Sequence, residues 1–246
     1  MATASPMRIV QLSDSHISRD HPRRAAELEA CVQYINATDP QPDAIIHTGD
    51  IAHNGHAEEY AIAKRLLDNL VAPYFVLAGN RDSRRELIKT FADGRFLRSD
   101  MPYVQYAVEH FPARLIVIDT VSENNRKGRL CQWRLADIGR MLAADTTRPA
   151  ALFLHHPPFD VTVAPEPFQF EEFADVEALM AEVGQHRHVH GVFCGHIHRE
   201  FETTVESMRA SVVSSVASDV RWDKPVAAEA GLPVLKTLVV PVSTSC

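Results

Sequence analysis

The chain has 246 residues, of which 46% are hydrophobic and 23% are charged, and its formal net charge is −7. That length and composition are enough for one hydrophobic core, so we expect a single domain over residues 1–246. The acidic balance argues against a surface for a nucleic acid polymer. No apolar stretch reaches the length of a membrane span or a signal peptide, so we expect a cytoplasmic protein with no membrane partner.

Short apolar segments bounded by turn residues alternate with longer amphipathic segments, a pattern that is typical of α/β proteins. In chain order, we expect strands at 7–13, 43–49, 74–79, 103–109, 114–120, 149–156, 189–195, 201–206, 210–216 and 234–240. Apolar residues at three- and four-residue spacing predict helices at 22–36, 57–70, 83–92, 132–144 and 173–183. After residue 199 we expect further strands and no further helix, so 199–246 forms a C-terminal strand region. Residues 157–173 are rich in Pro and Phe and lack a period, which predicts a long loop over the site.

Polar side chains follow five of these strands at the carboxyl end, where α/β proteins bind their ligands. The five segments are Asp14-Ser15-His16, Gly49-Asp50, Gly79-Asn80-Arg81-Asp82, His155-His156 and Gly195-His196-Ile197-His198. Zinc, manganese and iron prefer this mixture of imidazole and carboxylate ligands. One residue separates Asp14 from His16 and also His196 from His198. In an extended backbone that spacing directs both side chains of a pair to the same side.

The number of candidate ligands indicates how many ions they hold. The candidates are Asp14, His16, Asp50, Asn80, His155, His196 and His198. Seven ligands exceed the four that one tetrahedral zinc takes, whereas two divalent ions about 3.5–4 Å apart would use them all by sharing a carboxylate. Asp50 is the expected bridge, because the preceding glycine lets the backbone turn tightly. Each motif taken singly is more typical of a turn or a helix cap, and it is their coincidence at five strand ends that favours a metal centre.

With these residues in place, the chain resembles the calcineurin-like metallophosphoesterase superfamily, whose motifs are D-x-H, G-D, G-N-H-[DE], H and G-H-x-H. Here they read DSH (14–16), GD (49–50), GNRD (79–82), HHPP (155–158) and GHIH (195–198), and the resemblance covers about residues 7–204. Within the superfamily the chain is most similar to the bacterial class III cyclic nucleotide phosphodiesterases and the related glycerophosphodiesterases. The resemblance implies a four-layered αββα sandwich of two mixed β-sheets flanked by helices.

The resemblance also implies a cofactor and an activity. One divalent ion would be held by Asp14, His16, Asp50 and His198, and a second by Asp50, Asn80, His155 and His196. The ions would be iron, manganese or zinc, and a metal-bridging hydroxide would attack the phosphorus of a small phosphodiester of the cyclic nucleotide or glycerophosphodiester type. A phosphomonoesterase is the nearest alternative, and a non-catalytic binding or scaffold protein is disfavoured because all seven ligand positions are intact. Relatives are often dimers or larger, so a homo-oligomer is left open.

Arg81 departs from the family pattern, which usually has histidine at this position in contact with the substrate phosphate. Arginine keeps the positive charge and can grip phosphate with two hydrogen bonds, but it cannot donate a proton near neutral pH. We therefore predict that Arg81 binds substrate and contributes electrostatically to catalysis beside Asn80. The alternative is that Arg81 turns away and forms an ion pair with Asp82 or with another carboxylate.

Three further polar residues lie close to these motifs. His156 is predicted to act in catalysis and substrate binding, either by orienting a ligand or by touching the substrate, with a strand-end cap as the alternative. His53, just after the expected bridge, is predicted to line the substrate pocket. Asp82 is predicted to cap the following helix or to hold His16 or Arg81, and not to bind metal.

Overall fold

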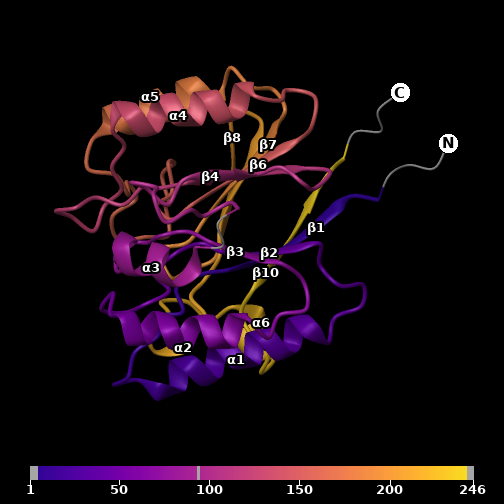
Figure 1. Ribbon diagram of the computed structural model, residues 1–246, viewed down its shortest axis with the longest axis vertical. Coiled ribbons are helices and arrows are strands. Elements are labelled where there is room, and N and C mark those ends of the chain that lie inside the picture. The colour runs from indigo at the N-terminus through magenta and orange to yellow at the C-terminus, as the bar shows by residue number, and fades with distance from the viewer. Residues whose placement is uncertain (1–4, 93–94, 243–246) are drawn as a thin grey trace.

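The computed structural model describes residues 5–92 and 95–242, whose strands form two sheets lying face to face with helices outside both (Figure 1). The four-stranded sheet has the order β10-β1-β2-β3, and the six-stranded sheet has the order β4-β5-β6-β7-β9-β8. The first sheet contains β1 (Met7–Leu12), β2 (Ala44–His47), β3 (Tyr74–Val76) and β10 (Lys236–Val240). The second contains β4 (Tyr106–Val108), β5 (Arg114–Ile118), β6 (Ala150–Leu154), β7 (Val189–Cys194), β8 (Phe201–Val205) and β9 (Met208–Val212).

Both sheets are mixed. In the first sheet β1, β2 and β3 are parallel, while β10 runs antiparallel to β1. In the second sheet β5, β6, β7 and β9 are parallel, and the edge strands β4 and β8 are antiparallel to their neighbours. The carboxyl ends of the parallel strands therefore point to one edge of each sheet, where the loops that follow them can meet.

The helices cover the outer face of each sheet. They are α1 (Pro22–Asn36), α2 (Ala57–Leu67), α3 (Arg84–Phe91), α4 (Gln132–Ala143), α5 (Phe173–Val183) and the short α6 (Val226–Glu229). Figure 1 shows α4 and α5 along the top, beyond the six-stranded sheet, and α1 and α2 along the bottom, beyond the four-stranded sheet. None of the helices in the described part of the chain is long and apolar enough to cross a bilayer.

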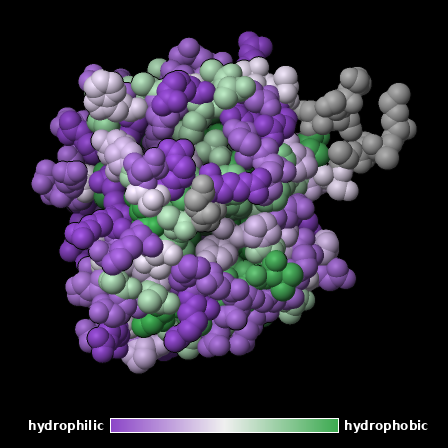
Figure 2. Space-filling view, viewed as in Figure 1, coloured by the Kyte–Doolittle hydropathy of each residue, from purple (hydrophilic) through white to green (hydrophobic). Residues whose placement is uncertain are grey.

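Alternation along β5 explains why the fold has four layers. Leu115 and Val117 belong to the apolar cluster that contains the first sheet, whereas Ile116 and Ile118 belong to the cluster that contains Ile138 of α4. Successive side chains of a strand point to opposite faces, so a strand with apolar residues on both faces must be covered on both sides. Figure 2 shows a mostly hydrophilic outer face with small separate apolar patches, in keeping with burial of the apolar residues between the layers.

The predicted fold class, two mixed sheets flanked by helices, is confirmed, but the region after residue 199 differs in detail. It contains α6 and a 3₁₀ turn at Ser218–Val220, so the prediction that it lacks helix was wrong. The predicted strand 210–216 is observed at Met208–Val212, because Glu206 and Ser207 form a tight hairpin between β8 and β9. Both residues have positive φ, 48° and 72°, as a two-residue hairpin of the right twist requires. Glu-Ser is not a usual sequence for such a turn, which is why the pattern did not predict it.

The two sheets are tied together at the edge where the carboxyl ends lie. The side-chain amide of Gln11 in β1 donates to the carbonyl oxygen of Cys194 in β7 at 2.9 Å. The backbone N–H of Val216 donates to the carbonyl of Ser13 at 3.0 Å. The first bond holds the end of β1 against the end of β7, and the second joins the loop after β1 to the segment after β9. The His196 N–H in turn donates to Asp14 Oδ2 at 3.0 Å, which positions two of the predicted ligand motifs next to each other.

Candidate metal centre

The loops after β1, β2 and β7 hold their polar residues in an unusual backbone conformation. The described non-glycine residues with positive φ are Asp14 (55°), His16 (44°), Asp50 (51°), His196 (78°), His198 (51°), Glu206 and Ser207. Apart from the two hairpin residues, every one of them is a predicted metal ligand. The left-handed region costs an ordinary residue about 1–3 kcal/mol, and such strain gathers at functional sites.

Asp14 and His16, and likewise His196 and His198, were expected to point to the same side because of an extended backbone. Their positive φ values show that this reason was wrong. Asp14 and His16 lie in a tight turn and not in an extended segment, yet their side chains still approach, with 3.8 Å between Asp14 Oδ1 and His16 Nε2. His196 and His198 separate instead, because they belong to two different groups of side chains. Sequence spacing therefore predicted proximity for both pairs, but tertiary structure decided which group each histidine joins.

The first group consists of Asp14, His16, Asp50 and His198, whose ligand atoms all lie within 4.8 Å of one another. His198 Nε2 lies 3.1 Å from His16 Nε2 and 3.2 Å from Asp14 Oδ1. His16 Nε2 lies 3.6 Å from Asp50 Oδ2. Two carboxylates and two imidazoles thus converge on one point, with Asp14, His16 and Asp50 buried.

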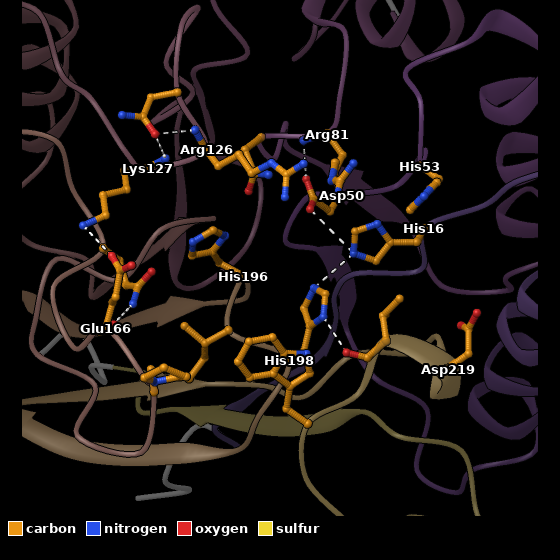
Figure 3. Close-up of a pocket in the computed structure, with 18 residues that line it drawn as sticks. His16, Asp50, His53, Arg81, Arg126, Lys127, Glu166, His196, His198 and Asp219 are labelled. Atoms are coloured by element: carbon orange, nitrogen blue, oxygen red, sulfur yellow. Dashed lines mark hydrogen bonds and ion pairs between the residues drawn. The ribbon is translucent and has the colours of Figure 1, made fainter.

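The second group gathers around His155, which is fully buried. His155 Nε2 lies 3.2 Å from Asn80 Oδ1 and 3.6 Å from Asp50 Oδ1. The His196 ring centroid is 5.0 Å from that of His155. Asp50 therefore lies between the groups, with Oδ2 toward His16 and Oδ1 toward His155; Figure 3 shows Asp50 between His16 and the Arg81 side chain, with His196 and His198 below.

The hydrogen bonds of the histidines test whether these groups fit metal ions. The Nδ1 atom of His155 donates to the carbonyl of Thr48, and that of His198 donates to the carbonyl of Val220, both at 2.8 Å. In the neutral imidazole each Nε2 then carries a lone pair, which in His155 faces the carbonyl oxygen of the Asn80 amide. Two acceptors at 3.2 Å repel each other unless a cation lies between them. The donor set therefore fits divalent ions, whose ligating histidines are commonly oriented by such carbonyls.

The electrostatics of the metal-free groups lead to the same conclusion. Burial raises the pKa of Asp14, but the neighbouring His198 outweighs that effect, and the net pKa lies well below its usual range. Burial and the Asp14 charge raise the pKa of Asp50 to about 8. Burial lowers the pKa of His16, His155 and His196, so these rings are neutral at pH 7 and have lone pairs to offer. A divalent cation would relieve the repulsion between the two carboxylates.

Asp82 has a role that the sequence did not predict. Its carboxylate accepts hydrogen bonds from the backbone N–H groups of Ile51, Ala52 and Gly79 at 3.2, 3.0 and 2.9 Å, and from the Tyr60 hydroxyl at 3.0 Å. The predicted capping role was wrong, because the hydroxyl of the next residue, a serine, caps α3. The predicted pairing with His16 or Arg81 is not observed either. Asp82 instead joins the loop that carries Asp50 to the loop that carries Asn80.

His156 is fully buried, and both of its ring nitrogens already have protein partners. Nδ1 lies 2.8 Å from the Thr120 hydroxyl, and Nε2 donates to the carbonyl of Arg126 at 2.9 Å. The ring packs 4.5 Å from that of His196 between centroids. His156 therefore has no ring nitrogen free for the predicted contact with the substrate. Its packing against His196 agrees instead with the predicted role of orienting a ligand.

A pocket of about 690 Å³ opens over both groups, which is within the usual range for small-molecule sites. Its lining includes His16, Asp50, His53, Asn80, Arg81, Arg126, Lys127, Glu166, Gln169, His196, His198 and Trp222. His53 and Arg81 thus line the pocket, as predicted. Residues 164–166 and 169 of the predicted long loop also line it. Within the described residues, the Arg81 guanidinium makes no ion pair with Asp82 or with any other carboxylate.

Arg126, Lys127 and Trp222 are pocket residues that the sequence analysis did not identify. The only signal was the short polar run of residues 124–128 between a predicted strand and a predicted helix, which reads as an ordinary loop. Trp222 lies in the region that was expected to consist of strands. Their place in the site follows from the folding of distant loops over the sheet edge.

Similarity to known proteins extends over most of the chain. A model of the calcineurin-like phosphoesterase family matches residues 7–200. A probable glycerophosphodiester phosphodiesterase of Arcobacter nitrofigilis is 30% identical over 227 residues, which cover 88% of this chain and 82% of the relative. A probable cyclic nucleotide phosphodiesterase of Rhodopseudomonas palustris is 31% identical over 235 residues, covering 92% and 84%. A crystal structure of a dimetal phosphatase from Danio rerio matches with a TM-score of 0.74 and 14% identity over 96% of this chain and 93% of the other, a likeness of fold alone.

Proposed function

Because the chain belongs to the calcineurin-like phosphoesterase family of metal-dependent hydrolases, we propose that it is a dinuclear hydrolase of small phosphodiesters of the cyclic nucleotide or glycerophosphodiester type. The observation that carries the proposal is the position of Asp50. Its two carboxylate oxygens face two separate groups of nitrogen and oxygen ligands, each at 3.6 Å from the nearest imidazole nitrogen. A shared carboxylate between two ligand groups is the arrangement of two-metal phosphoesterases.

The ligand sets that support this proposal are four side chains around each position. Asp14, His16, Asp50 and His198 would hold one ion, and Asp50, Asn80, His155 and His196 would hold the other. His156 is excluded from the second set because both of its nitrogens are engaged by the protein. Two bound divalent ions would supply a water that is deprotonated near neutral pH and would polarise the phosphate oxygens.

The residues of the chain itself orient the reaction. The backbone N–H of Arg81 donates to Asp50 Oδ1 at 2.7 Å and so holds the shared carboxylate in place. The Arg81 guanidinium faces the pocket, where it would stabilise the negative charge that develops on the phosphate and on the departing oxygen. Because arginine cannot lose its proton near neutral pH, the departing oxygen would take its proton from water.

The class of substrate is supported by the pocket and by the relatives. A pocket of about 690 Å³ suits a small molecule, and a net charge of −7 offers no attraction to a polyanionic strand. The two relatives at 30% and 31% identity carry names of phosphodiesterases that act on glycerophosphodiesters and cyclic nucleotides. Diesters are therefore favoured over monoesters for this chain.

The test combines metal content with a choice between two chromogenic substrates. The purified protein should bind about two equivalents of manganese or zinc and should hydrolyse bis(p-nitrophenyl) phosphate faster than p-nitrophenyl phosphate. Asp50→Asn should lose at least one equivalent and reduce kcat/KM about a hundredfold or more. Asp100→Asn, the same change at an exposed ion pair with Arg98, is the matched control and should do neither. A single equivalent in the wild type, or faster turnover of the monoester, would overturn the proposal.

A further inference from the structure

Two guanidinium groups in the pocket have no partner of opposite charge. Arg81 follows β3, and Arg126 lies in the loop between β5 and α4; both line the pocket, and among the residues that the structure describes neither makes an ion pair. Lys127 is different, because its ammonium lies 2.9 Å from Glu166. In Figure 3 the Arg126 side chain extends along the upper edge of the pocket toward Arg81.

The position of Arg126 is set by contacts of its own backbone. Its carbonyl accepts a hydrogen bond from His156 Nε2 at 2.9 Å, and His156 packs against His196 of the candidate metal centre. Two residues later, Gly128 donates to the carbonyl of Gln169 at 2.8 Å. A Cβ on Gly128 would lie 2.9 Å from the Cβ of His156, so the loop can approach the histidine this closely only with glycine there. Arg126 is therefore held over the site on both sides and is not an arginine on a free loop.

The sum of charges in the loaded site indicates what these two arginines could bind. Two divalent ions carry four positive charges, and Asp14 and Asp50 remove two of them. A phosphodiester with one negative charge and an anionic nucleophile remove the other two. Arg81 and Arg126 then add two positive charges that a simple diester leaves unbalanced. The nearby acidic groups do not balance them, because Glu166 is paired with Lys127 and Asp219 is paired with Arg24 at 2.8 Å.

We propose that Arg126 forms a subsite for a second phosphate, next to the scissile phosphate that Arg81 would bind, so that the preferred substrates are phosphodiesters that carry a further phosphate group. This inference rests on the proposed phosphodiesterase function and narrows it. The planar guanidinium binds phosphate oxygens with two parallel hydrogen bonds, and such charge-assisted bonds are stronger than neutral ones. Arg81 would serve the scissile phosphate, and Arg126 would select for the phosphate next to it.

The test measures binding directly, by calorimetry on the manganese-loaded protein, with adenosine 5′-monophosphate and adenosine 5′-diphosphate as probes. The wild type should bind the diphosphate about tenfold more tightly than the monophosphate, the difference expected of one charged pair of hydrogen bonds. Arg126→Gln should bring the two affinities to within about twofold. Arg85→Gln removes the same charge from an exposed residue of α3 that lies outside the pocket, and it should keep the wild-type ratio.

Two results would overturn the subsite: equal affinities in the wild type, or an unchanged tenfold ratio in Arg126→Gln. Hydrolysis of bis(p-nitrophenyl) phosphate, which has no second phosphate, separates this inference from the proposed function. If the wild type hydrolyses that substrate while the binding ratio does not respond to Arg126→Gln, the subsite alone is refuted. If the wild type fails to hydrolyse it at all, the phosphodiesterase proposal fails, and the binding ratio still decides whether Arg126 holds a second phosphate.

Discussion

Asp82 is the residue whose removal tests most directly how the candidate site is held together. Its carboxylate accepts bonds from Ile51, Ala52, Gly79 and Tyr60 at 2.9–3.2 Å, and its side chain is buried. Asp82→Ala leaves four donors without an acceptor, and each unpaired buried donor costs about 1–3 kcal/mol. The four costs do not add, because the donors are neighbours and water can enter the space, so we expect a net loss of about 3–5 kcal/mol in the free energy of unfolding.

The same substitution should weaken metal binding, since the two loops that Asp82 joins carry Asp50 and Asn80. Loss of a group that orients the ligands typically lowers metal affinity by about 10–100-fold. Urea denaturation of the metal-free protein measures the first effect, and calorimetric titration with manganese measures the second. A control is Tyr60→Phe, which removes one of the four donors and also the acceptor of the Ser83 N–H. It should cost about 1–2 kcal/mol with little change in metal affinity.

Two outcomes would refute the reasoning about Asp82. One is an Asp82→Ala protein that unfolds within about 0.5 kcal/mol of the wild type, which would mean that its four hydrogen bonds contribute no more than a surface residue does. The other is a destabilised protein with unchanged metal affinity. That result would show that the two loops keep their positions without the carboxylate.

Three further substitutions or conditions probe other parts of the structure. Gly195→Ala places a Cβ within 2.7 Å of Asp14 Oδ2, so we expect the free energy of unfolding to fall by about 1–3 kcal/mol and metal binding to weaken. Thermal unfolding measures the first effect, and an unchanged Tm would contradict the close packing of these loops. Arg114→Leu removes a fully buried guanidinium that bonds to a carboxylate and to three backbone carbonyls. It should cost about 3 kcal/mol in urea denaturation while the metal content of the folded protein stays the same. In the metal-free protein, burial raises the pKa of Asp50 to about 8 and that of Asp82 to about 7, above the unfolded value of 3.8. The folded state therefore keeps protons that the unfolded state has lost, and the free energy of unfolding should fall as pH rises from 7 to 8, by up to about 1.4 kcal/mol per pH unit for each retained proton, and level off above about pH 8, whereas a rise between pH 7 and 8 would be inconsistent with these shifts.

The sequence by itself determined the layers and the inventory of the site. Strand β6 is apolar at every position, and β5 is apolar at every position after Arg114. Such strands must be covered on both faces, which leads to helices outside a pair of sheets. Polar residues directly after such strands have to emerge at one edge. This local rule is enough to nominate Asp14, Asp50 and His155 without any knowledge of the contacts between them.

Tertiary structure alone decided which ligand group each of those residues joins and which contacts hold it in position. His196 and His198 are two positions apart, yet they join different groups, because left-handed turns and not an extended strand set their directions. Asp82 takes its four donors from three separate segments of the chain, and Arg126 is fixed by a histidine 30 positions away. Such contacts depend on how distant loops meet once the sheets have packed, and neither periodicity nor spacing within one segment carries that information.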